Sequence, residues 1–165
     1  MIRVVVDELA HMSVDAILRP ADEVLAPATA EMSRLDGLAG EGFLAARRVS
    51  SPLEAGAAVV TSGGALPAPF VLHVIIRDPA SPVGREVVRR ALVSAWQRAE
   101  AWGLHRVAAP LVGAGSGQLT LEESAGLLAE TFGESAATGG PAELHIVVGQ
   151  EAERELVEAV VRRMQ

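Results

Sequence analysis

The chain has 165 residues, half of them apolar, and a formal net charge of -7. A chain of this length can bury a core of its own, so we expect one domain over residues 1–165. The excess of 21 acidic over 14 basic residues argues against general nucleic-acid binding and against an anionic membrane surface. Cysteine is absent, which excludes disulfides, thiolate metal sites and cysteine nucleophiles. No apolar run reaches the roughly 18 residues of a transmembrane helix and no signal peptide is evident, so we predict a cytoplasmic protein.

The first half of the chain predicts four strands and a weak helical region. Short runs rich in β-branched residues predict strands at 2–6 and 15–19. The helical pattern between residues 23 and 48 is interrupted by proline and glycine. Strands are predicted again at 58–62 and 70–77. The last is almost continuously apolar, as in a central strand covered on both faces.

The second half has clearer helix signals. Ser81 and Pro82 predict the start of a helix whose buried face includes Trp102. After a predicted strand at 106–112, Thr120 and Glu123 have the spacing of a capping box at the start of the next helix.

A last strand is predicted at 144–148 and a last helix at 151–164. Apolar strands that alternate with helices predict an α/β fold in which helices cover both faces of a sheet.

A glycine-rich turn joins the strand at 106–112 to the capped helix. Glycines let backbone N–H groups converge, and a helix N-terminus attracts anions, so the turn is a candidate phosphate site. It matches neither common nucleotide motif, because the chain has no lysine and position 118 is Gln. A tight turn that lets helix and sheet pack closely explains it equally well. The candidate residues are Gly113, Ala114, Gly115, Ser116 and Gly117.

Four segments together resemble the macro domain family, in order and at its spacings. They are Val14-Asp15-Ala16-Ile17, Val59-Val60-Thr61-Ser62-Gly63-Gly64-Ala65-Leu66-Pro67-Ala68, Val71-Leu72-His73-Val74 and Ala109-Pro110-Leu111-Val112-Gly113-Ala114-Gly115. The resemblance implies a three-layer α/β/α sandwich with a mixed central sheet. It also implies a small nucleotide ligand, ADP-ribose or a similar molecule, and in some members hydrolysis of ADP-ribosyl or O-acetyl-ADP-ribose bonds.

The chain departs from the family in the segments that would contact the ligand. The family's Gly-Asp-Ile-Thr becomes Asp7-Glu8-Leu9-Ala10, so by resemblance Glu8 would face the adenine, with Leu9 beside it. The family's Val-Asn-Ala-Ala-Asn becomes Leu18-Arg19-Pro20-Ala21-Asp22. Its glycine run is replaced by residues 26–32, which contain no glycine.

Two polar residues of the second segment remain ligand candidates. Asp22 would take the place of an asparagine that contacts the distal ribose, but it accepts hydrogen bonds without donating any. Arg19 either offsets the negative charge of Asp22 beside a diphosphate or forms a salt bridge with Asp22 or Glu23.

Three functions therefore stay open. The first is a nucleotide-binding module, and the second is a macro-like fold that acts through protein contacts or self-association as a homo-oligomer. The third is a hydrolase with Asp22 as its only, weak catalytic candidate. We assign no cofactor and no metal site: His11, His105 and His145 lack metal-ligand spacing, and His73 fits a core position.

Overall fold

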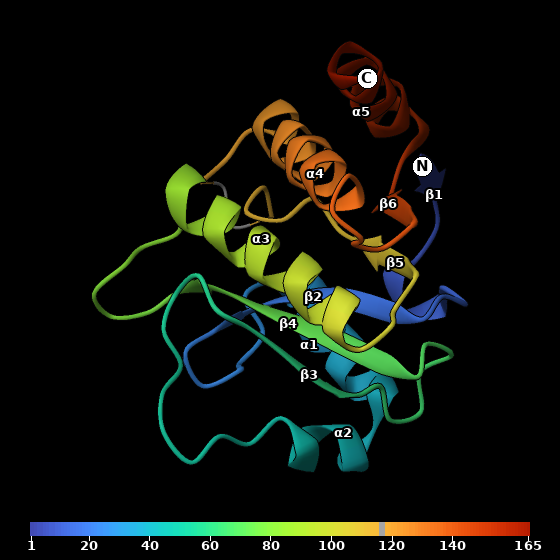
Figure 1. The fold of residues 1–165 in the computed structure, drawn as a ribbon. Helices are drawn as coiled ribbons and strands as arrows, with labels where there is room; N and C mark the ends of the chain where they lie inside the picture. Colours follow the sequence, from blue (N-terminus) through green and yellow to red (C-terminus); the bar gives the residue numbers. More distant parts are fainter. Residues whose placement is uncertain (116–117) are drawn as a thin grey trace.

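A computed structural model describes residues 1–115 and 118–165 and contains a six-stranded mixed sheet (Figure 1). The strand order is β1-β6-β5-β2-β4-β3. Strand β3 is antiparallel to β4, and the other neighbours are parallel. The strands are β1 (Ile2–Val6), β2 (Ala16–Asp22), β3 (Ala58–Ser62), β4 (Phe70–Arg77), β5 (Arg106–Ala109) and β6 (Glu143–Val148).

Helices lie on both faces of this sheet. Figure 1 shows α3, α4 and α5 on one side and α1 and α2 on the other. Together with the mixed sheet, this confirms the predicted three-layer α/β/α sandwich. The helices are the short 3-10 helix η1 (Leu9–His11), α1 (Ala30–Ala39), α2 (Glu41–Ala46), α3 (Arg85–Ala101), α4 (Leu121–Ala136) and α5 (Glu151–Met164).

The central strands are buried on both faces, which explains their continuous apolar sequence. Successive residues of a strand point to opposite faces of the sheet. Leu72 and Val74 therefore pack in the core beneath α3, α4 and α5, whereas Val71 packs in the core beneath η1, α1 and α2.

The predicted capping signal is present in the structure. Thr120 and Glu123 form a complete capping box at the start of α4. Asp15 has a structural role, because its carboxylate accepts hydrogen bonds from the backbone amides of His105 and Arg106, each at 2.9 Å. No helix within the described residues combines the length and the apolar character needed to cross a bilayer.

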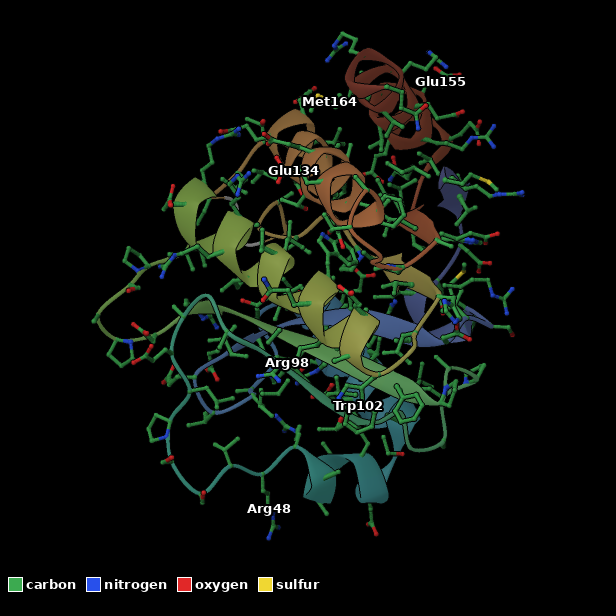
Figure 2. The ribbon with its side chains drawn as sticks, in the orientation of Figure 1. Arg48, Arg98, Trp102, Glu134, Glu155 and Met164 are labelled. Carbon is green, nitrogen blue, oxygen red and sulfur yellow. The ribbon has the colours of Figure 1, made fainter. Side chains whose placement is uncertain are left out.

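Other boundaries differ from the prediction. Helix α3 begins at Arg85 instead of Ser81, because Asp78 and Ser81 first pair with each other in a tight turn. Trp102 is not on the buried face of α3. It is 55% exposed just beyond the end of the helix (Figure 2), where its ring packs edge-on against Phe70.

Two strand ends also differ. The predicted strand at 106–112 ends at Ala109, because the chain turns at residues 112–115. The strand predicted at 15–19 instead continues to Asp22, alongside β4.

A buried ion pair joins α1 to the middle of the sheet. Arg19 on β2 is completely buried, and its guanidinium donates two hydrogen bonds to the carboxylate of Asp36 on α1, at 2.7 and 2.6 Å. The second basic side chain near this carboxylate is Arg47, whose Nε lies 3.7 Å from it. The pair therefore fixes the position of α1 relative to β2.

The same guanidinium fixes the tautomer of His73. Arg19 only donates, so the Nδ1 of His73, 3.1 Å away, must accept. The proton is then on Nε2, which donates to Thr61 Oγ1 at 2.7 Å, and the ring stacks on Phe43. Burial, together with the nearby positive charges of Arg19 and Arg47, lowers the pKa of His73 from 6.5 to about 3. His73 is thus a neutral core histidine, as the sequence predicts.

Removing Asp36 should destabilise the fold strongly, since it leaves Arg19 as an unpaired buried cation. We expect Asp36→Ala to lower the free energy of unfolding in urea at pH 7 by about 3–5 kcal/mol. Arg19→Met in the same background should restore part of this loss. The control is a change at Glu134 on α4 (labelled in Figure 2): Glu134→Ala breaks an exposed pair with Arg89 and should cost less than about 1 kcal/mol. If Asp36→Ala and Glu134→Ala lowered the free energy of unfolding equally, the buried pair would have no special role in stability.

The neutral state of His73 should make stability depend on pH. Between its ordinary pKa of 6.5 and its folded pKa of about 3, the ring is protonated only in the unfolded chain. The unfolded state then binds more protons, so stability falls as the pH falls. The control is His73→Gln, which keeps a donor and an acceptor. Relative to this variant, the free energy of unfolding of the wild type should fall by about 1.4 kcal/mol per pH unit below 6.5. Urea melts of both proteins between pH 7 and 4.5 measure this difference. If the free energies of unfolding of wild type and His73→Gln changed in parallel with pH, His73 would not be a neutral group with a lowered pKa.

Candidate functional site

A large cavity lies at the carboxyl ends of the parallel strands. Its volume is about 880 Å³, within the range of small-molecule sites. Residues at or just after the ends of β1, β6 and β5 line it, and α1 forms a side wall. Open α/β sheets bind ligands at this edge.

One end of the cavity is acidic. Asp7, Glu8, Glu31 and Glu153 line it, and Arg34 is the single basic residue among the lining residues that the structure describes. Glu8 forms an exposed ion pair with Arg34 at 3.9 Å, and its carboxylate lies 3.4 Å from the ring of His11. Burial raises the pKa of Glu31, and the charges of Glu153 and Glu8 add to that rise against the opposing effect of Arg34. This end therefore favours a neutral or donor-bearing group over an anion.

The other end is uncharged and contains the glycine turn. Gly113, Ala114 and Gly115 all line the cavity. Gly113 has a φ of +86°, and a Cβ there would lie 2.8 Å from Leu119 Cδ1, so a larger residue would be strained and crowded. Proline, leucine and isoleucine side chains complete the uncharged lining at Pro20, Ile76, Pro110, Leu111, Leu119 and Leu121.

The sequence-predicted site residues divide into three groups. Glu8 and Leu9 line the acidic end, and residues 113–115 line the uncharged end, so one cavity brings these five together. Ser116 and Gly117 lie outside the described residues.

Arg19 and Asp22 are not among the lining residues. The salt-bridge partner of Arg19 is Asp36, not Asp22 or Glu23, and this buried pair occupies its guanidinium. Asp22 accepts hydrogen bonds from the backbone amides of Val24 and Ala26, at 3.0 and 2.9 Å. Its carboxylate thus holds the tight turn after β2 instead of facing the cavity.

The segment without glycine forms the wall opposite the glycine turn. Pro27 pairs with Ala21 in an isolated bridge, and the amide of Ala28 donates to the carbonyl of Pro20 at 3.2 Å. The chain then enters α1 at Thr29, whose hydroxyl accepts from the amide of Met32 at 3.3 Å. This segment is therefore a start of α1 that is held by backbone hydrogen bonds and by a side-chain cap.

Sequence reasoning missed three charged residues of the cavity. Glu31 and Arg34 fall in the weakly helical region, and Glu153 falls in the first turn of α5, where an acidic residue ordinarily serves the helix dipole. Only the three-dimensional meeting of α1, η1 and α5 places them around one space. Within the described residues, no group of three or more metal-ligating side chains is assembled.

Comparison with known proteins supports the resemblance. The family model for the macro domain matches residues 33–128. A relative from Aeropyrum pernix, described as an uncharacterized protein, is 29% identical over 119 residues, which cover 72% of this chain and 63% of that protein. The chain thus spans less than two thirds of the length of this relative.

Solved macrodomain structures are similar throughout the chain. A macrodomain of Oceanobacillus iheyensis with ADP has a TM-score of 0.83 at 17% identity, over 98% of this chain and 90% of that one. A Trypanosoma brucei macrodomain in complex with ADP-ribose has a TM-score of 0.85 at 21% identity, over 97% of this chain and 68% of that one. These likenesses concern the fold. Because the family model covers more than half of the sequence, the chain belongs to the macro domain family.

Proposed function

We propose that this chain is a binding module for ADP-ribose or a related nucleotide diphosphate, without efficient catalysis. The observation that carries this proposal is that one cavity is lined both by Glu8 and by the glycine turn at residues 113–115. The similar solved structures that hold ADP and ADP-ribose support it.

The acidic end suits the base. Adenine is neutral and its amino group donates, so a carboxylate oxygen of Glu8 can accept its hydrogen bond. A phosphate at this end would be repelled: two negative charges 4 Å apart cost about 4 kcal/mol at an effective dielectric constant near 20. Charge therefore sets one orientation, with the base near Glu8 and the phosphates directed away from it.

The uncharged end suits the phosphates. The described residues of the glycine turn carry no side chain larger than a methyl group, so a phosphate can approach their backbone closely. Ala30, in the first turn of α1, also lines the cavity, next to Thr29, which contacts Gly115. Amides in a first helical turn have no acceptor within the helix, so they can donate to an anion.

Binding is favoured over hydrolysis because the single catalytic candidate does not face the cavity. Asp22 accepts backbone hydrogen bonds in its own turn and is absent from the lining. The predictions of a cytoplasmic location and of self-association remain predictions.

Glu8 should determine the preference for adenine. By isothermal titration we expect micromolar binding of ADP-ribose, and about tenfold or more weaker binding of the same ligand with hypoxanthine as its base, because hypoxanthine has a carbonyl in place of the amino group. A hydrogen bond to a charged group is worth about 1.5–3 kcal/mol, which corresponds to this factor. Glu8→Ala should remove the preference between the two bases.

The control is Glu41→Ala, which removes an exposed carboxylate that does not line the cavity and should keep the preference. No heat and no shift in melting temperature with either ADP-ribose or ADP at millimolar concentration would refute the proposed function. A preference for adenine that survives in Glu8→Ala would remove Glu8 from base recognition.

A further inference from the structure

We propose that Thr29 determines how long a ligand the cavity accepts, so that nucleotides ending at their phosphates bind better than those that continue into a second sugar. This inference rests on the proposed function and names the ligand class within it. The inference is based on the contact between the start of α1 and the glycine turn, which are the two walls at the uncharged end of the cavity.

The walls are in close contact at Thr29 and Gly115. A Cβ built on Gly115 would lie 3.0 Å from Thr29 Cγ2 and 3.8 Å from Thr29 Cβ, and both residues line the cavity. A phosphate or sugar needs van der Waals clearance on each side, and this separation leaves none for a group between the methyl and the Gly115 backbone. The contact therefore narrows the space between the walls at this point.

The methyl group cannot readily turn away. The hydroxyl of Thr29 caps α1 by accepting from the amide of Met32, and the carbonyl of Thr29 accepts from the amide of Ser33 at 3.1 Å. Because the hydroxyl and the methyl share one β-carbon, the cap that fixes Oγ1 also fixes Cγ2.

The preceding backbone is held as well. The bridge between Ala21 and Pro27 and the hydrogen bond from Ala28 to Pro20 tie the segment to the end of β2. Helix α1 is itself fixed by the buried pair of Asp36 and Arg19. Widening the passage thus requires moving either the capped helix or the glycine turn.

A ligand with its base at Glu8 brings its phosphates toward this contact. A nucleoside monophosphate or diphosphate can stop before it. In the proposed orientation, the second ribose of ADP-ribose would lie at or beyond it. The contact consequently acts on the distal sugar and leaves the adenine end unaffected.

The test is a double-mutant cycle with ADP and ADP-ribose as the two probes, measured by isothermal titration. Thr29→Ser keeps the capping hydroxyl and deletes only the methyl, whereas Gly115→Ala adds a methyl on the opposite wall. One methyl-sized group in a pocket changes affinity by about tenfold or more. We expect wild-type protein to prefer ADP, and Thr29→Ser to raise the affinity for ADP-ribose relative to ADP about tenfold.

The cycle should also show coupling. Gly115→Ala should lower the relative affinity for ADP-ribose further, and the double variant should recover it, because the deleted methyl makes room for the added one. The matched control is Thr138→Ser, an exposed threonine outside the cavity, which should leave the ratio unchanged. Melting temperatures of all variants report whether the helix cap is intact.

The outcomes separate the two claims. If both ligands bind and their ratio is the same in wild type, Thr29→Ser and Gly115→Ala, the steric role of Thr29 is refuted and the proposed function stands. If neither ligand binds to wild type or to Thr29→Ser at millimolar concentration, the proposed function is refuted, and this inference with it.

Discussion

A buried ion pair between Arg19 and Asp36 connects helix α1 to the centre of the sheet. Its geometry is bidentate and solvent is excluded, so breaking it leaves a charge with no compensation. The helix that it fixes supplies the side wall of the cavity, from Thr29 at the cap to Leu38 near the other end. The position of that wall therefore depends on a pair that does not itself line the site.

Charged residues are distributed unevenly along the cavity. Carboxylates gather where β1, η1 and the start of α5 meet, and the turn after β5 is uncharged in its described part. The net charge of the protein is -7, so long-range attraction does not bring a phosphate to this cavity. Under the proposed function, binding rests on local backbone donors and on the base, so we expect a modest affinity.

The sequence was sufficient for the fold but not for one wall of the site. Continuous apolar strands, the capping box at Thr120 and the glycine turn each carry local signals, and the structure contains all three in its described part. The partner of Arg19 was missed because Asp36 looks like an ordinary surface acid of a weak helix. A signal was nevertheless present, since Asp36 is four residues after Met32 and three before Ala39, both of them buried. The closure of Thr29 on Gly115 depends on a contact between segments 86 residues apart, which no local pattern encodes.

The orientation of the ligand is the central claim, and amide chemical shifts test it most directly. Backbone ¹⁵N–¹H spectra should be recorded during titration with adenosine and then with ADP. We expect adenosine to shift the amides of Glu8, Leu9 and Ala10, and ADP to add shifts at Ala30 and at residues 113–115. Shifts at the glycine turn with adenosine alone, or phosphate-dependent shifts confined to Glu8 and its neighbours, would contradict the orientation.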